Sequence, residues 1–314
     1  MINYEDKIDS LNENTELAFY ENALECIGLN EGIDIKGKVE AAKNAVINFF
    51  KTIRKKISYI ITKIKNKWKN SKLKAKVDKI GNKIKGKDGA EIAKKVSAKY
   101  IHGNKSVEKG GSEAIGTSIN FVKYADFGIS YHPINDSGVS AILSAEDDGI
   151  AAMDKIRVSL GNVGDYNRQP KAITKDFVSK VGTDPAKLRA SLVQDREQKL
   201  ANIGMSALNS VASEISKAQK AIDDSAVKGT KFDKVCANAE SELGKVKAEH
   251  FDTNEQFNSF KTLCNDSIST TRSVFNILTG AIKSLSQYIT QMYGVLDRID
   301  AVCTTYNITD DSIR

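Results

Sequence analysis

Residue types that commonly carry catalysis are sparse in this 314-residue chain. His102, His132 and His250 lie far apart, and none stands in the Ser, Cys or acid motif expected of a catalytic triad or a zinc protease. The cysteines show no close spacing of the kind that binds zinc, which fits a reducing compartment; they are Cys26, Cys236, Cys264 and Cys303. The sequence therefore predicts no enzyme, no catalytic residue and no cofactor.

One stretch concentrates carboxylates, the preferred ligands of hard cations. Its members are Glu146, Asp147, Asp148 and Asp154. No histidine and no glycine-containing ligand loop accompanies them, and they fall in a helix-like pattern over residues 140–160. A solvated helix face is expected there, with no metal site.

A second pattern bears on nucleotide binding. Gly81 to Lys87 reads G-x-x-x-x-G-K, which is one residue short of a phosphate-binding loop. Asp88 stands where Ser or Thr would bind Mg²⁺, and a lysine-rich helical pattern precedes the motif instead of a buried strand. The motif is therefore not interpreted as a nucleotide site.

The basic character of the chain comes from one block, residues 36–109, with 23 Lys and Arg against 5 Asp and Glu. Within it, apolar residues step by three or four and so predict one long amphipathic helix: Val39, Ala42, Val46, Phe50, Ile53, Ile57, Ile60, Ile64 and Trp68. The pattern resumes at Leu73, Val77, Ile80 and Ile84. The net charge of +7 for the whole chain hides this segregation.

Three interpretations of the basic helix remain open. Its apolar face can pack on its own domain with the lysines in solvent. Its cations can bind nucleic-acid phosphates without reading bases, or an acidic protein surface. The residues proposed for polyanion binding are Lys51, Arg54, Lys55, Lys56, Lys63, Lys65, Lys67 and Lys69. Alternatively, residues 39–68 can lie on an anionic membrane, with Trp68 near one end.

The C-terminal part predicts long helices. Thr183-Asp184-Pro185 is typical of a helix start, and a helix is expected to about Val227, ended by Gly229, with a shorter one over 233–250. Residues 254–306 carry a heptad seam: Ile268, Thr271, Phe275, Leu278, Ile282, Leu285, Ile289, Met292, Leu296, Ile299 and Cys303. We expect an antiparallel helical hairpin or bundle, or a homo-oligomeric coiled coil.

The fold class expected is mainly α. The segments are an acidic N-terminal segment (1–31, helical over 14–28), a basic amphipathic region with a Gly-rich linker (32–110), a small mixed middle region (111–182) and a C-terminal helical bundle (183–314). Residues 120–131 alternate partly and fit a strand or a loop. Neither a signal peptide nor a membrane-spanning helix is predicted.

The junction between the acidic and basic segments suggests processing. Residues 1–31 hold eight acidic residues and one lysine, and they end at Leu29-Asn30-Glu31, followed by Gly32. A Leu, any residue, Glu and a small residue resemble the site cut by the prohead proteases of large tailed bacteriophages. The resemblance implies that the cleavage residues are Leu29, Glu31 and Gly32.

Together with the lysine-rich body, this junction resembles an internal head (prohead core-type) virion protein of such a phage. The resemblance covers about the first 110 residues in character only. It implies a non-enzymatic structural protein of the capsid interior, present in the host cytoplasm during assembly, which meets a prohead protease and associates with DNA or scaffold. The alternatives are a membrane-surface protein and an enzyme with a deep polar pocket around residues 120–165.

Overall fold

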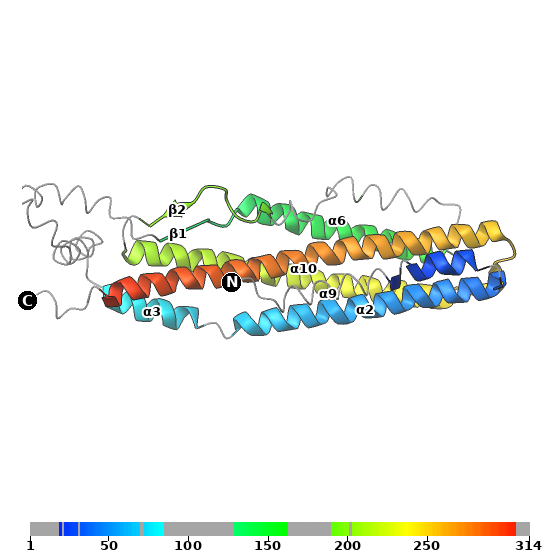
Figure 1. Ribbon diagram of the computed structural model, residues 1–314, viewed down its shortest axis with the longest axis horizontal. Helices are drawn as coiled ribbons and strands as arrows, with labels where there is room; N and C mark the ends of the chain where they lie inside the picture. Colours follow the sequence, from blue (N-terminus) through cyan, green and yellow to red (C-terminus); the bar gives the residue numbers. More distant parts are fainter. Residues whose placement is uncertain are drawn as a thin grey trace, which may run out of the picture. The chain divides into compact units, whose positions relative to one another are not determined.

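The computed structural model describes residues 19–20, 22–30, 32–69, 72–84, 129–162, 177, 190–200 and 203–305. This part of the chain is mainly α, as predicted (Figure 1). The helices are α2 (Ile35–Lys69), α3 (Leu73–Ile84), α6 (Asp136–Gly161), α9 (Met205–Lys245) and α10 (Asn254–Thr305), with the short 3-10 helix η2 (Ala248–His250). The strands are β1 (Ser130–Tyr131) and β2 (Gln198–Lys199).

The chain divides into two compact units, each assembled from three separate stretches. Unit 1 comprises Met1–Ile64, Ser140–Arg189 and Asp223–Ile282, and unit 2 comprises Lys65–Val139, Ala190–Ile222 and Lys283–Arg314. Helices α2, α6, α9 and α10 therefore each contribute residues to both units, which are described separately below. The four segments expected from the sequence, with boundaries at residues 31, 110 and 182, stay a prediction.

Helix α2 begins at a capping residue and buries the stripe that the sequence marks. The Asp34 carboxylate accepts a hydrogen bond from the Gly37 backbone N–H at 2.8 Å, which satisfies one free donor of the first turn. The predicted apolar residues from Val39 to Ile64 are all at most 9% exposed. Among the three interpretations of the basic helix, this burial matches an apolar face packed on its own domain.

The expected break in the third long helix is wrong. Helix α9 continues through Gly229 to Lys245, so the helices expected before and after that glycine are one. A Cβ at Gly229 would lie 2.5 Å from Cδ1 of Ile61 on α2. This glycine therefore permits close packing of α2 against α9 in unit 1 and does not end a helix.

The expectation of one continuous helix from residue 183 to about residue 227 is also wrong, because residues 191–200 are not helical. Ala190 is helical, but α9 begins only at Met205, because the backbone between them pairs with another segment. Ser130 and Tyr131 pair antiparallel with Lys199 and Gln198, and the Leu200 N–H donates to the Ile129 carbonyl at 2.9 Å. The proposed helix start at residues 183–185 lies outside the described residues, as do residues 120–128 of the expected strand or loop.

Helix α10 follows the predicted bounds closely. A reciprocal cap precedes it: Thr253 Oγ1 accepts from the Gln256 N–H at 3.2 Å, and Gln256 Oε1 accepts from the Thr253 N–H at 3.1 Å. Every seam residue from Ile268 to Cys303 is at most 2% exposed. Polar residues beside the seam, such as Ser267 and Thr270, are also fully buried, so α10 packs on more than one face.

The acidic stretch of α6 differs from the expectation of a solvated face. Glu146 is fully buried in unit 1, where its Oε1 accepts a hydrogen bond from the Ser225 hydroxyl of α9 at 2.9 Å. Its Oε2 is buried without a partner. Asp147 does lie at the surface, where it pairs with Lys228. The hydrophobic periodicity predicted the position of α6 correctly, but it did not predict that the Glu146 side chain faces inward.

Candidate polyanion-binding face of helix α2

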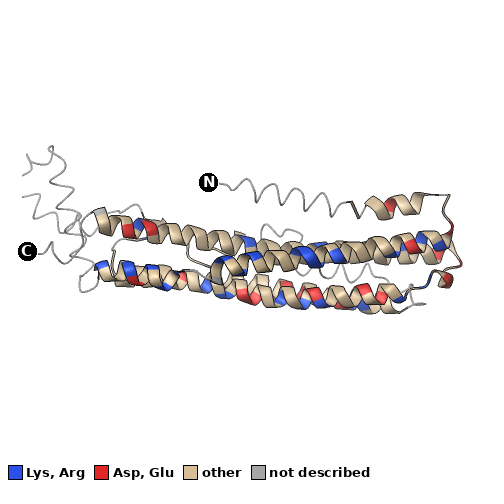
Figure 2. Cartoon of the chain, turned by 90° about the horizontal axis from the view of Figure 1, so that it is seen from below, with Lys and Arg blue, Asp and Glu red and all other residues tan. Residues whose placement is uncertain are grey.

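Helix α2 carries ten lysines and Arg54 against one acidic residue, Glu40. Because its apolar stripe is buried, these cations occupy the sides and the outer surface of the helix. Lys and Arg recur along the helices with Asp and Glu between them (Figure 2). Whether a given cation can meet an external anion therefore depends on its partners within the protein.

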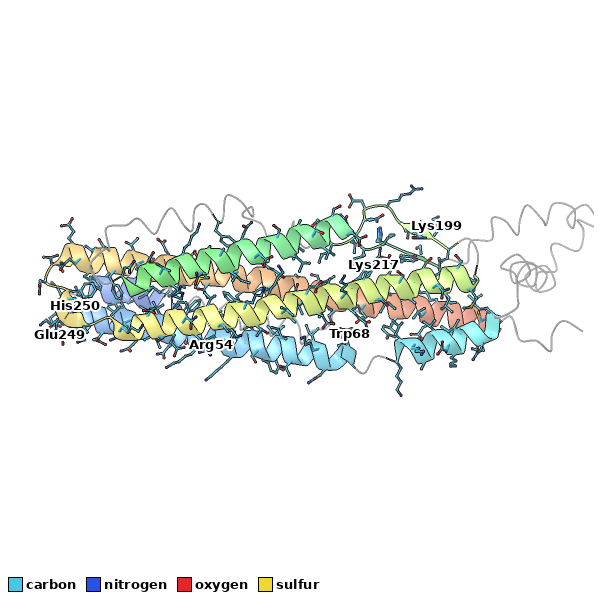
Figure 3. The ribbon with its side chains drawn as sticks, turned by 180° about the vertical axis from the view of Figure 1, so that it is seen from behind. Arg54, Trp68, Lys199, Lys217, Glu249 and His250 are labelled. Carbon is cyan, nitrogen blue, oxygen red and sulfur yellow. The ribbon has the colours of Figure 1, made fainter. Side chains whose placement is uncertain are left out.

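Two of the predicted polyanion-binding residues already have acidic partners on α9. Arg54 Nε donates to Asp233 Oδ1 at 3.0 Å, and its Nη1 donates to Glu240 Oε2 at 3.1 Å. Lys51 Nζ lies 3.6 Å from the other oxygen of Glu240. Figure 3 labels Arg54 on α2, beside α9. The two arginine bonds form a planar fork that joins α2 to α9, so Arg54 serves packing in unit 1.

Asp233 and Glu240 were not identified from the sequence as partners of the basic helix. They are seven residues apart, which places them on one face of α9. That spacing is the signal that was available. It could not reveal which helix the face would meet.

Beyond this fork lies an open groove of about 650 Å³ on unit 1. Its lining comes from the two ion-paired cations together with other side chains of α2 and one acid of α9: Lys51, Arg54, Lys55, Ser58, Tyr59, Thr62 and Asp233. Lys55 is exposed, and the Tyr59 side chain is 61% exposed. Lys63 Nζ lies 5.6 Å from the centre of the Tyr59 ring. The groove lining thus includes the exposed lysines Lys51 and Lys55, the hydroxyl side chains of Ser58 and Thr62, and the exposed Tyr59 ring, and Lys63 lies beside that ring.

Not every predicted cation contributes equally to this surface. Lys56 is half-buried and has a partner within the protein. Lys65 is half-buried in unit 2, and the Lys69 side chain lies outside the described residues. Lys67, also in unit 2, has its Nζ 4.8 Å from the Trp68 ring centre. Lys51 is exposed too but pairs with Glu240, so among the described residues Lys55 and Lys63 are the exposed cations near Tyr59 that have no acidic partner.

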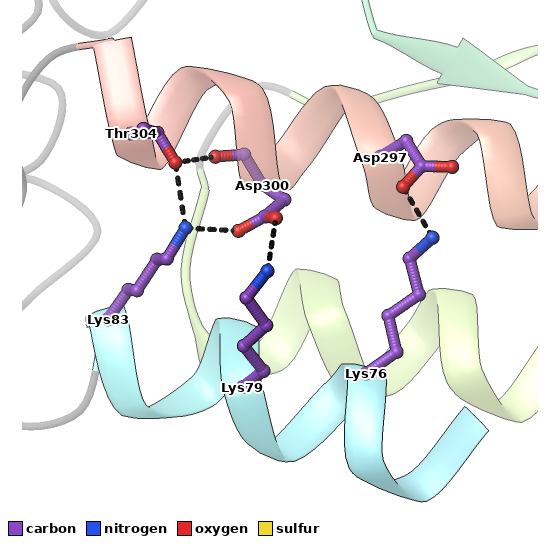
Figure 4. A network of polar contacts seen from close by, with 6 residues as sticks. All are labelled: Lys76, Lys79, Lys83, Asp297, Asp300 and Thr304. Carbon is purple, nitrogen blue, oxygen red and sulfur yellow. Dashed lines mark hydrogen bonds and ion pairs between the residues drawn. The ribbon is translucent and has the colours of Figure 1, made fainter. Parts of the chain in front are cut away.

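In unit 2 the basic block continues into α3, whose lysines meet acids of α10 (Figure 4). Lys76 pairs with Asp297. Lys83 Nζ donates to Asp300 at 2.5 Å and to Thr304 Oγ1 at 2.7 Å, and Lys79 lies 3.5 Å from the second Asp300 oxygen. The hydrogen bond from Lys83 lowers the pKa of Asp300, and both lysine charges add to this effect against partial burial. These lysines therefore hold α3 on α10.

The predicted cleavage residues lie at the surface where they are described. Leu29 is 80% exposed, and Gly32 is exposed, with its N–H bonded to the Asn30 side chain at 3.0 Å. Glu31 lies outside the described residues. The segment before this junction, helical at residues 19–20 and 22–29, packs on unit 1 through Leu24, which is fully buried.

Comparisons with protein-family models, curated proteins and solved structures find no match for this chain. Among the described residues, no helix is long and apolar enough to cross a membrane. The same residues contain no group of three or more His, Cys, Asp or Glu side chains placed to hold a metal ion.

Proposed function

We propose that this chain is a non-enzymatic structural protein of a tailed-phage capsid interior, which associates with nucleic-acid backbone through Lys55, Lys63 and the Tyr59 groove. One observation supports this proposal above the others: the apolar stripe of α2 is buried while these three side chains remain exposed. Lysines are compact charges suited to phosphate contacts without base recognition. Residues 1–31 would be a propeptide, cut by a prohead protease between Glu31 and Gly32.

The membrane alternative has less support from the packing. A helix that binds a membrane surface inserts its apolar face among the lipids. Ile57 and Ile64 on that face of α2 are 1% and 9% exposed. Lipid binding by this helix would first require unit 1 to open, whereas phosphate binding uses side chains that are already at the surface.

The proposal is tested by salt-dependent binding of the full chain to a random-sequence DNA. Each phosphate contact contributes a slope of about −0.9 in log K against log salt. The double variant Lys55→Gln, Lys63→Gln should weaken binding and reduce the steepness of the slope by up to about 2. The matched control is Lys231→Gln, Lys234→Gln, which removes two exposed lysines of α9 in the same unit.

A chain starting at Gly32 should bind more tightly than the full chain, because eight acidic residues are then absent. If the two double variants lose the same amount of DNA affinity, the loss reflects net charge alone, and Lys55 and Lys63 do not form a binding site. Binding to anionic vesicles with no binding to DNA would support the membrane alternative. If the chain binds neither DNA nor anionic vesicles, the lysines of α2 only form a solvated helix surface.

A further inference from the structure

Unit 2 contains a second concave surface, where the β1 segment lies against α10. It encloses about 410 Å³. Its walls come from the chain around β1 (Ser130, Tyr131, His132), from Val193 and from α10 (Tyr288, Gln291, Met292, Gly294, Val295, Arg298). This volume is near the lower end of the usual range for small-molecule pockets, about 300 to 1,000 Å³.

The pocket has an apolar floor. Tyr131, Tyr288 and Val295 are each 6% exposed, and Met292 is 1% exposed. The Tyr288 hydroxyl is already used, because it donates to Glu214 Oε2 at 3.1 Å. The same oxygen accepts the Ile134 N–H at 2.6 Å, which ties the segment after β1 to α9. The floor is therefore held in place and is suited to an apolar group.

Gly294 lies in the wall of the pocket and leaves open space there. Glycine inside a helix is less stable than alanine, so it usually has a packing reason. At Gly229 and Gly149 that reason is present, since an added Cβ would lie 2.5 Å and 2.7 Å from a neighbouring side chain. At Gly294 an added Cβ would meet nothing within 4 Å. Packing within unit 2 therefore does not require a glycine at this position. The absence of a side chain at Gly294 leaves space for a ligand in the pocket.

The polar groups of α10 lie on either side of this glycine. Gln291 precedes it by three residues and Arg298 follows it by four, so all three share one helix face. Gln291 and Arg298 are exposed. In the part of the chain that the structure describes, Arg298 has no hydrogen bond or ion pair, whereas Arg54 has two acidic partners. A guanidinium at the edge of an apolar pocket favours a planar carboxylate, which it can bind with two parallel hydrogen bonds.

We propose that this pocket binds a small amphipathic carboxylate, with its apolar body over Met292 and Val295 beside Gly294 and its carboxylate on Arg298. A single cation above an apolar floor matches one negative charge on an apolar chain and does not match a polyphosphate. The site lies in unit 2 and shares no residue with the proposed nucleic-acid groove. It stands independently of the proposed function.

The test uses octanoate as the probe and the methyl groups of methionine as reporters. The chain has four methionines, and Met292 is the one that lines the pocket. In the full chain labelled with ¹³C-methyl methionine, octanoate should shift the Met292 signal saturably and leave Met153 of α6 unchanged. Octanol, the neutral analogue, should bind at least about tenfold more weakly, because it cannot form the charge-assisted bond.

Two substitutions separate the carboxylate contact from the cavity. Arg298→Gln should weaken octanoate binding about ten- to a hundredfold and leave octanol binding unchanged. Arg196→Gln is the matched control, because Arg196 is exposed in unit 2 and does not line the pocket. Gly294→Leu should fill the space and abolish binding of both probes. The control for a large residue at an open helix position is Gly244→Leu in α9, where an added Cβ also meets nothing within 4 Å.

Several results would overturn the proposal. A Met292 signal that does not respond to octanoate would exclude the pocket as a binding site for this class. Equal affinity for octanol and octanoate, or full octanoate affinity in Arg298→Gln, would exclude recognition of the carboxylate. Unchanged binding in a folded Gly294→Leu variant would place the ligand elsewhere.

Discussion

The indole N–H of Trp68 on α2 donates a hydrogen bond to the Ser286 hydroxyl of α10 over 3.0 Å. The Trp68 ring also stacks on Tyr293, with the ring centres 5.9 Å apart and the planes 15° from parallel. The membrane interpretation placed this tryptophan at a lipid surface, whereas here it belongs to the packing of unit 2. Trp68 is the single tryptophan of the chain, so its fluorescence reports on that packing.

The first prediction concerns the seam of α10, near this contact. Leu285 is 2% exposed, and Leu285→Asp would bury a carboxylate that has no partner. We expect a loss of about 3 to 5 kcal/mol in the free energy of unfolding, measured by denaturant titration with Trp68 fluorescence. Gln287→Asp introduces the same side chain at an exposed position two residues away and should cost less than about 0.5 kcal/mol. Equal midpoints for the two variants would show that the seam is not buried.

A second prediction concerns pH and Glu146. Burial raises the pKa of this carboxyl from 4.5 to about 7, with Asp147 and Asp224 also raising it, while the Ser225 hydrogen bond and the Lys228 charge oppose the shift. The unfolded chain loses this proton near pH 4.5 and the folded chain near pH 7. The contribution of Glu146 to stability is therefore complete below pH 4.5 and falls by roughly 3 kcal/mol as the pH rises through 7.

Glu146→Gln should remove this dependence, because the amide oxygen can still accept from Ser225 and does not titrate. The variant should gain stability over the wild type progressively between pH 4.5 and 7, as measured by thermal unfolding across that range. Asp147→Asn changes the exposed neighbour and should leave that pH dependence in place. A wild-type curve that is flat across this interval would contradict the burial of the Glu146 charge.

These cases show which structural features can be predicted from the sequence alone. Periodicity along one helix located the buried stripes of α2 and α10, because the residues that share a face are fixed by helix geometry. The inward direction of Glu146 and the pairing of Arg54 with Asp233 depend on which helices become neighbours. The continuity of α9 through Gly229 was missed for the same reason. A side chain at that position would collide with Ile61, which is far away in the sequence.

The third prediction concerns the attachment of α3. Asp300 accepts Lys83 and lies near Lys79, so Asp300→Asn should weaken the hold of α10 on α3. We expect faster amide hydrogen exchange across residues 73–84, with global unfolding shifted little. Lys83 lowers the pKa of Asp300 below its ordinary value of 3.8. The stabilising contribution of the Asp300 carboxylate is therefore present above pH 3.8 and is lost as the pH falls through the lowered pKa. Asp78→Asn, at an exposed acid of α3 itself, is the control and should leave the exchange rates unchanged.

The last prediction concerns the fate of residues 1–31 after a cut between Glu31 and Gly32. The Tyr20 hydroxyl lies 3.1 Å from Thr52 Oγ1, and its ring packs edge-on against Phe49 at 5.7 Å between ring centres. Leu24 is completely buried. These contacts are non-covalent and persist when the peptide bond is broken. We therefore expect the cut segment to remain docked on the rest of unit 1.

A protease site inserted at this junction gives the measurement. After cleavage in vitro, the peptide should co-elute with the rest of the chain in size-exclusion chromatography and be seen by intact mass. Leu24→Ala removes a buried side chain, weakens docking by about 2 to 4 kcal/mol and should release the peptide. Glu25→Gln changes an exposed residue of the same helix and should not release it. A wild-type peptide that leaves on cleavage would show that docking depends on the covalent bond, and DNA affinity should then rise at the moment of the cut.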